Sequence, residues 1–490
     1  MRVHPSAFLQ TWQVVLKLAS SVKGKVAVED LRFQIGSLQL AGPAATGALV
    51  QTLQPCLRPE GDDRDSAAAI WPVLVRLNNP ASLPAGVVIH LDISDPRLHL
   101  PRRVEVDGKH EMDSEQLLEI LTGWPLDEDP GKSSIFSHDA RHNAVRRMPS
   151  QKAINRRRAL SEVGETLKMQ EGDPEIPVLL MSSQGTANQD GLWTVLLPWK
   201  CVLPVWYSLM YHPLSSGGTL HFGGLDQIRQ TAFEAGRAWF PADYPGTPAG
   251  MAWEAREQQR RHADWTKRPK GKRSEYDSTA LGRGRKGEIG RGWACDWQYL
   301  AGTETNDVGG LLLRPVHQSL IPEGLPADRA RDIQTCKMQS MAVCTVRLRV
   351  IGRGVPATCA RIYRLPSDGT WRSQWVSLAD PSRASIGGKP PSLPADTPAY
   401  LKRRALAEAL LNGPPKTVAG EATYPDVPDE EDLIGFVTTG NFNLGHGKGI
   451  GIGAIAWEKV AAQFKSKYGQ LCVFRNAGES LGRLARFELV

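Results

Sequence analysis

The sequence has few cysteines, and none lies at a spacing typical of a disulfide framework or a zinc ribbon. The seven cysteines are scattered over 490 residues, no two of them form a CxxC pair, and their number is odd. Small secreted domains and zinc ribbons both need cysteines paired at short intervals. The start of the chain also lacks the apolar stretch of a secretory signal peptide. These absences favour a reducing compartment.

Motifs of common catalytic sites are absent as well. There is no GxSxG turn for a serine nucleophile, and His110 lacks the second histidine of a zinc protease. We interpret His138 and His142 as surface or RNA-facing side chains rather than a metal pair, because no second pair of ligands follows them. The sequence therefore predicts no catalytic residues, no metal site and no cofactor.

Only one apolar run, residues 192–211, is long enough to cross a bilayer as a helix, and its one charge is Lys200. Pro198 and Pro204 would each interrupt such a helix. We therefore expect no membrane span.

The same run predicts two buried strands, Trp193–Leu197 and Val202–Leu209, around a Pro-Trp-Lys turn. We expect Trp193, Trp199 and Trp206 to fill the core between them. Apolar residues then recur at helical spacing from Leu225 to Phe233, and the proline- and glycine-rich FPADYPGTPAG run that follows predicts irregular structure.

Positive charge is concentrated in parts of the chain. The net charge is +7 and the pI is near 9.0. Residues 256–291 hold twelve Lys and Arg against five Asp and Glu, a balance of +7 in this stretch alone. Trp253, Trp265 and Tyr276 are interleaved with these charges. A basic run is often only a solvated face, but basic side chains also neutralise phosphates and aromatic rings stack on unpaired bases.

The glycine-rich stretch GHGKGIGIG, Gly445–Gly453, does not have the spacing of a Walker phosphate loop. Alternating glycines expose backbone N–H groups, so that with His446 and Lys448 this stretch would grip an RNA backbone. A β-bulge or a tight strand crossing in a barrel explains the glycines equally well.

We predict RNA contacts from two basic clusters and from the neighbourhood of these glycines. The predicted residues are Arg141, Arg146, Arg147, Lys152, Arg156, Arg157 and Arg158, then Lys267, Arg268, Lys270, Lys272 and Arg273, and finally His446, Lys448 and Arg475.

The expected fold class is α+β in several domains, with helices on a mostly antiparallel sheet and a strand-rich, barrel-like C-terminal domain. The expected parts are an α+β domain over 1–126, a basic loop-rich segment over 127–175, a tryptophan-rich central domain over 176–266, a basic Gly-rich connection over 267–335, and a β-rich domain over 336–490. The connection between Lys267 and Gly292 is expected to be mobile.

Several elements are predicted by periodicity and by turn residues. Helices are expected at 5–19, near 49–53, at 113–121 and from Thr397-Pro398 to Gly413-Pro414. A strand or a bent strand pair is expected at 26–40, and further strands at 87–93, 342–351, 360–365, 434–439, 472–475 and 485–489.

Long motifs along the chain resemble one family. They include HPSAFLQTWQVVL and LQLAGPAAT near the start, NRRRAL at Asn155–Leu160, the tryptophan-rich run described above, KRPKGKRSEYDS at Lys267–Ser278, and IGFVTTGNFNLGHGKGIGIGAIAW followed by VFRNAGESLGRLARFEL. They resemble the largest protein subunit, the "processing of precursors" subunit, of nuclear ribonuclease P and ribonuclease MRP. Members of that family carry a long basic region ahead of this point, of which this sequence has almost none.

The resemblance implies a noncatalytic RNA-binding scaffold. The RNA of the complex would remove 5′ leaders from precursor tRNA, with any magnesium belonging to the RNA site, and rRNA processing would depend on the same scaffold. Expected partners are the ribonuclease P/MRP RNA, the smaller protein subunits and, indirectly, precursor tRNA, in the nucleus and nucleolus. Parts of this subunit are similar to the T-protein of the glycine cleavage system. The alternative function is therefore a folate-dependent aminomethyltransferase-like, one-carbon enzyme, although a fold does not carry a function.

Overall fold

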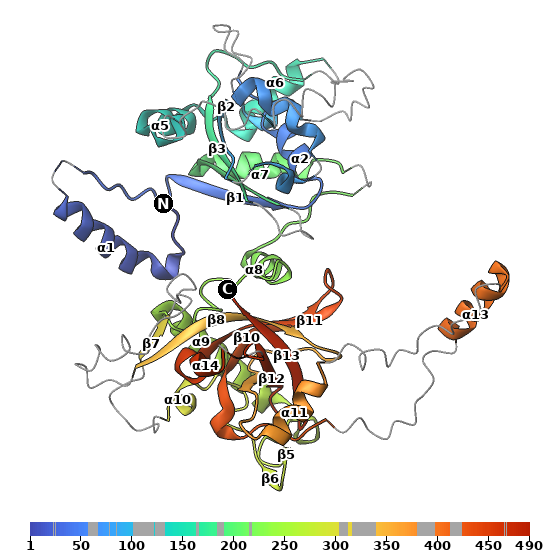
Figure 1. Cartoon of the computed structure of the whole chain (residues 1–490). Coiled ribbons are helices and arrows are strands. Elements are labelled where there is room, and N and C mark those ends of the chain that lie inside the picture. The colour runs from blue at the N-terminus through green and yellow to red at the C-terminus, as the bar shows by residue number, and fades with distance from the viewer. Residues whose placement is uncertain are drawn as a thin grey trace. The chain divides into compact units, whose positions relative to one another are not determined.

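The structure is a computed structural model of the whole chain (Figure 1). It describes residues 1–22, 24, 26–56, 67–77, 79–84, 86–100, 122, 133–162, 166–183, 191–214, 218–302, 312–315, 340–379, 397–411, 424–464, 466 and 468–490. The chain divides into two compact units: residues 16–225, here the sheet unit, and residues 1–15 with 226–490, here the barrel unit. The helix predicted at 113–121 lies outside the described residues.

A four-stranded antiparallel sheet organises the sheet unit. Its strands lie in the order β1 (Ile35–Ala41), β4 (Leu192–Pro198), β3 (Ile176–Ser183) and β2 (Val88–Ile93). Alternate residues of β2 are buried, whereas the first five residues of β3 are all buried. Because successive side chains of a strand point to opposite faces, β3 is covered on both faces of the sheet.

Short helices make up much of the rest of the sheet unit. They are α2 (Ala45–Thr52), α3 (Ala67–Ile70), α5 (His138–Arg147), α6 (Gln151–Leu160) and α7 (Val202–Met210), with 3₁₀ turns at Trp71–Arg76, Pro80–Ser82, Pro96–His99, Ser134–Phe136 and Trp199–Cys201. Ser137 and Ser150 cap α5 and α6, because each hydroxyl accepts a hydrogen bond from a backbone N–H of the first turn. The core includes Trp71 and Trp193, whose rings meet edge to face at 5.9 Å.

The barrel unit contains a closed barrel of six strands. They follow in the order β8 (Ser340–Val350), β11 (Lys448–Ala456), β10 (Leu433–Asn443), β9 (Arg361–Arg364), β12 (Leu471–Arg475) and β13 (Arg483–Leu489), and β13 pairs with β8 to close the ring. All six pairings are antiparallel, and closure leaves no unpaired edge among these strands. The short strand β7 (Leu312–Pro315) joins β8 in parallel.

The remaining elements of the barrel unit are mainly helices. They are α8 (Leu225–Glu234), α9 (Pro248–Lys267), α10 (Trp297–Leu300), α11 (Gly369–Ser377), α13 (Ala399–Leu411), α14 (Trp457–Phe464), the hairpin β5 (Ala280–Gly282) and β6 (Arg285–Lys286), and 3₁₀ turns at Pro5–Ala7, Lys270–Lys272 and Glu430–Asp432. Helix α1 (Phe8–Ser21) and helix α8 each contain a boundary between the two units.

The glycines of the GHGKGIGIG stretch make close strand packing possible. A Cβ atom on Gly453 would lie 3.0 Å from the Cα atom of Val437, and one on Gly451 would lie 3.2 Å from the ring of Pro356. Strand β10 also shifts register between Val437 and Thr439. The interpretation as a bulged, tightly packed barrel strand is confirmed for this part of the stretch.

The prediction of a strand at Val202–Leu209 is wrong, because these residues form helix α7. Pro204 lies in the first turn of the helix, where the N–H group that proline lacks has no partner in any case. Trp193 is fully buried as predicted, whereas Trp199 is 50% exposed and Trp206 is half-buried. The two later tryptophans therefore do not fill a core between strands.

Three further predictions need correction. The described part of the segment 127–175 contains two capped helices rather than mainly loops. Of the strand or bent strand pair predicted at 26–40, only the residues from Ile35 onward form a strand, β1. The FPADYPGTPAG run becomes helical at Pro248, where Thr247 caps α9. The predicted helix at 5–19, the helix after Leu225 and the C-terminal strands are confirmed. Among the described residues, no helix is long and apolar enough to cross a membrane.

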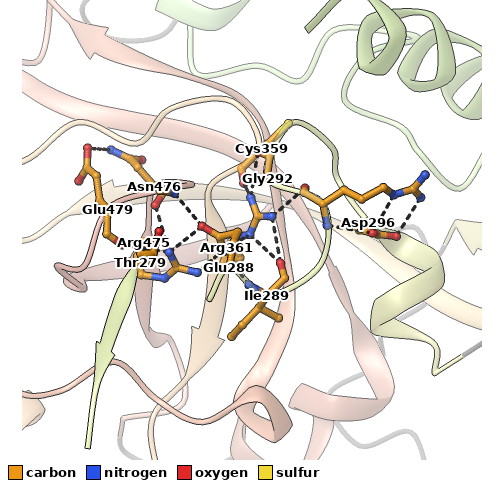
Figure 2. A network of polar contacts seen from close by, with 12 residues as sticks. Thr279, Glu288, Ile289, Gly292, Asp296, Cys359, Arg361, Arg475, Asn476 and Glu479 are labelled. Carbon is orange, nitrogen blue, oxygen red and sulfur yellow. Dashed lines mark hydrogen bonds and ion pairs between the residues drawn. The ribbon is translucent and has the colours of Figure 1, made fainter. Parts of the chain in front are cut away.

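The segment Lys267–Gly292, expected to be a mobile connection, is packed onto the barrel through a buried ion-pair network (Figure 2). Glu288 forms ion pairs with Arg361, at 3.0 Å, and with Arg475, and also accepts a hydrogen bond from Gly478 N at 2.7 Å. The Arg361 guanidinium donates to the carbonyl of Ile289. All three charged side chains are at most 2% exposed.

Burial alone would raise the pKa of Glu288, but the hydrogen bonds from Arg475 and the charge of Arg361 outweigh it and hold that pKa below its ordinary value. Glu288 therefore stays ionised and holds the segment against strands β9 and β12.

Candidate nucleic-acid interface

Four aromatic rings gather at the C-terminal end of α9. His262, Trp265, Tyr276 and Trp293, here the aromatic cluster, come from the helix, from the turn after it and from the loop before α10. The His262 and Trp293 rings are 4.6 Å apart, and the Trp265 ring lies 5.2 Å from Trp293 and 5.9 Å from Tyr276. His262 is exposed and the other three rings are half-buried. The cluster therefore offers aromatic surface to solvent.

Local structure explains this arrangement. His262 and Trp265 are three residues apart on α9, so they lie on the same side of the helix and their rings stack at 6.1 Å. After the helix ends, the chain folds back, and the indole N–H of Trp265 donates to the carbonyl of Ser274 at 3.0 Å. This bond brings Tyr276 against the tryptophan.

Positive charge surrounds the aromatic cluster. The guanidinium of Arg273 lies 4.8 Å from the centre of the Trp265 ring and donates to the carbonyl of Arg268 at 3.1 Å. Four exposed side chains form the rest of this surface, here the basic rim: Lys267, Arg268, Lys270 and Lys272. None of the four has an acidic partner within 4 Å among the residues that the structure describes.

Burial raises the pKa of the Tyr276 phenol, and the nearby charge of Arg361 only partly offsets it. The ring therefore stays neutral at physiological pH. The site combines neutral aromatic rings with unpaired cations, the chemistry that binds unpaired bases and their phosphates.

A smaller site of the same kind lies nearer the start of α9. Trp253 packs against Trp239 at 5.4 Å, and the guanidinium groups of Arg229 and Arg256 lie 5.8 and 5.5 Å from the centre of its ring. Trp253 is one of the aromatic residues that the sequence associates with the basic charges.

The predicted basic residues of the sheet unit fall into two groups. Arg146, Arg147, Lys152 and Arg156 are exposed. Arg141, by contrast, is 4% exposed and donates to the carbonyl of Ile135 at 2.9 Å.

Two residues of the arginine triplet on α6 also have structural partners. Arg157 forms an ion pair with Asp173 at 2.7 Å, and Arg158 donates to the carbonyl of Arg97 at 2.9 Å. Because consecutive helical residues point about 100° apart, the triplet does not present one surface. Only Arg156 is exposed.

Near the glycine-rich stretch, His446 and Lys448 lie exposed at and just after the turn between β10 and β11. Arg475, which was predicted to contact RNA, is instead fully buried against Glu288 (Figure 2). It acts within the fold and offers nothing to a ligand at the surface.

Two residues of the aromatic cluster, His262 and Trp293, were not predicted from the sequence. The spacing of His262 and Trp265 on a helix was a readable signal. Trp293 joins them only through the fold, across a segment held by Glu288, and no local pattern indicates that contact.

Two known domain families match parts of this chain. The POPLD (NUC188) domain model matches residues 192–297, and the POP1 C-terminal domain model matches residues 410–490. The first match contains the whole aromatic cluster and basic rim, and the second contains four of the six barrel strands.

Full-length similarity points the same way. The Ribonucleases P/MRP protein subunit pop1 of Schizosaccharomyces pombe is 27% identical over 489 residues, which cover 100% of this chain and 56% of that protein. The chain is therefore similar to a POP1 subunit along its whole length. The POP1 subunit of Saccharomyces cerevisiae is 22% identical and also matches 100% of the chain, and that of Homo sapiens is 23% identical over 51% of it.

The chain spans 56% and 58% of the two POP1 proteins that it matches throughout. The resemblance seen in the sequence motifs is therefore confirmed over the part of these proteins that the chain matches.

Proposed function

We propose that this chain is a noncatalytic, RNA-binding scaffold subunit of a ribonuclease P/MRP complex. The observation that carries the proposal is the aromatic cluster with its basic rim, located within the residues that match the POPLD domain model. In this role the protein supports 5′-leader removal from precursor tRNA, and rRNA processing, by holding the RNA that performs the cleavage.

The chemistry of the site suits such a role. Lys267, Arg268, Lys270 and Lys272 are exposed and neutralise phosphates of any sequence, so they supply affinity and position. Trp265 and its neighbouring rings accept unpaired bases by stacking, which is how RNA-binding proteins select loops and bulges. The RNA component is therefore the main proposed partner, together with the smaller protein subunits and, indirectly, precursor tRNA.

The proposed location is the nucleus and nucleolus, as for the complex in which the subunit would act. No cofactor is assigned to this function, and magnesium would belong to the RNA site. Nothing in the comparisons favours the alternative one-carbon enzyme. The similarity of the fold to the glycine cleavage T-protein stays a prediction.

The experiment is RNA recovery with the tagged chain from nuclei, followed by sequencing. We expect ribonuclease P and MRP RNA to be enriched with the parent. Replacement of the four basic-rim residues by Ala should reduce this enrichment. In binding assays with purified components, the same replacement should reduce the magnitude of the slope of log affinity against log salt concentration. The reduction should be about 0.7–0.9 for each phosphate that is no longer neutralised.

Changing the exposed Lys402 and Arg403 of α13 to Ala is the matched control. Equal RNA recovery and an equal salt slope for the rim variant would contradict the proposed interface.

A further inference from the structure

Two buried cysteines and a glutamate meet inside the barrel unit. Cys295 precedes α10, Cys359 precedes β9, and Glu254 lies on α9. One ligand atom from each of the three lies within 4.8 Å of the other two. Cys295 and Cys359 are 5% and 1% exposed. No short sequence motif indicates this site, because its two cysteines are 64 residues apart in sequence.

The distance between the sulfur atoms is informative. The two Sγ atoms are 3.8 Å apart. A disulfide bond would require about 2.05 Å. Two thiolates bound at about 2.3 Å to one tetrahedral zinc ion lie about 3.8 Å apart. The sulfur pair therefore has the separation of two zinc ligands without any movement.

Backbone and side-chain contacts hold the three groups in place. Cys359 has φ of +65°, in the left-handed region that residues with a side chain seldom adopt, and its N–H donates to the carbonyl of Val437 at 2.8 Å. The N–H of Cys295 donates to the Glu254 carboxylate at 3.0 Å. The sulfur and oxygen atoms are thus directed to one point by the fold.

A divalent cation would balance the net negative charge of the site. Glu254 pairs with Arg261, whose guanidinium also donates to the carbonyl of Trp293 at 2.8 Å. Two thiolates and one carboxylate carry three negative charges, and Arg261 neutralises one of them. A zinc ion brings the sum to zero, which is the condition under which charges are tolerated in a protein interior.

We propose that Glu254, Cys295 and Cys359 bind a zinc ion, with a water molecule as the fourth ligand. Both thiols lose their protons to solvent when the metal binds, and no electron is transferred. The ion joins α9, the loop before α10 and the start of β9. Because the same loop carries Trp293, the ion also fixes the position of the aromatic cluster.

The test measures metal in the purified chain. Protein produced with zinc in the medium and purified with a reductant should retain about one zinc ion per chain after gel filtration. The double variant Cys295→Ser, Cys359→Ser should retain almost none. Cys344→Ser is the matched control, because Cys344 is also buried in the barrel unit, where its sulfur contacts the carbonyl of Ile455.

A second measurement does not depend on any variant. The parent, stripped of metal under reducing conditions and titrated with Co²⁺, should develop thiolate-to-cobalt charge-transfer absorption and should regain thermal stability. A parent that holds no zinc and shows no such absorption would overturn the proposal. So would equal zinc loss in Cys344→Ser, or an intact mass lacking the two thiol hydrogens, which would identify the pair as a disulfide.

Discussion

Glu288 carries a negative charge in the interior of the barrel unit, and its two arginine partners are also buried. Removal of one partner from a buried ion pair leaves an uncompensated charge and costs about 3–5 kcal/mol. We therefore expect Glu288→Gln to lower the free energy of unfolding by an amount of that order. Thermal or urea unfolding at pH 7 measures the change. Glu408→Gln is the control, because Glu408 pairs with Arg404 on the exposed surface of α13.

The pKa of Glu288 lies below its ordinary value of 4.5, so its contribution to stability depends on pH. The unfolded state takes up the proton first as pH falls, so the contribution is complete above about pH 4.5 and is lost as pH falls through the folded pKa. We expect the stability difference between the parent and Glu288→Gln to shrink below pH 4.5. Melting curves at pH 7, 5 and 3.5 test this, and a constant difference would show that the charge of Glu288 is not responsible.

Trp265 is the aromatic residue most directly placed for stacking, since it contacts three rings and the Arg273 guanidinium. Loss of one stacked base costs roughly 1–3 kcal/mol in binding. Trp265→Ala should therefore weaken binding to single-stranded or loop RNA by about that amount, and Trp265→Phe should retain part of the affinity. Trp199→Ala, which also removes a partly exposed tryptophan, serves as the control. Equal affinities of Trp265→Ala and the parent would make the cluster structural only.

Neighbouring arginines on helix α6 have different surroundings, and the sequence alone does not distinguish them. Arg156 is exposed, whereas Arg157 pairs with Asp173, which is 8% exposed. Arg157→Ala should destabilise the chain by about 1–3 kcal/mol, because it leaves a buried carboxylate with fewer partners. Arg156→Ala should leave the melting temperature almost unchanged and affect only RNA binding. Differential scanning fluorimetry of the two variants tests this, and equal melting temperatures would contradict the structural role of Arg157.

Some elements of the fold were predictable from the sequence and others were not. The barrel strands were predictable because each is a short apolar or alternating run between turn residues, as at Ile434–Thr439 and Cys472–Arg475. The prediction of a strand at Val202–Leu209 is wrong because a short apolar run fits a strand and a helix equally well. Pro204 does not break this helix, because it lies in the first turn. Periodicity alone does not distinguish a strand from a helix in such a short apolar run.

The basic segment 267–292 illustrates a different limit. Its Gly, Lys and Arg content is that of a solvated linker, yet Glu288 anchors it to Arg361 and Arg475, which lie 73 and 187 residues further along the chain. Long-range contacts of this kind leave no trace in local composition. The predicted RNA-binding residues of this segment were therefore identifiable by charge, but their grouping around Trp293 was not.

At the scale of the whole molecule, the two units have separate hydrophobic cores. The core built on Trp71 and Trp193 lies within the sheet unit, and those built on Phe436 and Phe487 lie within the barrel unit. Each unit carries exposed cations of its own, the arginines of α5 and α6 in the sheet unit and the basic rim in the barrel unit, and under the proposed function both would bind RNA. Binding through several surfaces gains from effective concentration, so the intact chain should hold RNA more tightly than its best single site does.

The burial of Cys295 and Cys359 bears on whether the chain itself could catalyse RNA cleavage. Cys295 and Cys359 are too deeply buried for a phosphodiester to approach a zinc ion between them, so such an ion would act on the fold and not on RNA. We therefore expect the purified, RNA-free chain to cleave no precursor tRNA in the presence of magnesium or zinc. We also expect it to show no saturable binding of tetrahydrofolate.

A cleavage assay with 5′-labelled precursor tRNA checks the first expectation, and calorimetry with tetrahydrofolate checks the second. Leader removal by RNA-free protein that disappears in Glu254→Gln or Cys359→Ser would make the metal site catalytic and the scaffold assignment wrong. Cleavage that survives both changes but is removed by ribonuclease treatment of the preparation would instead trace the activity to RNA carried along on the basic rim, which is the behaviour expected of a scaffold subunit.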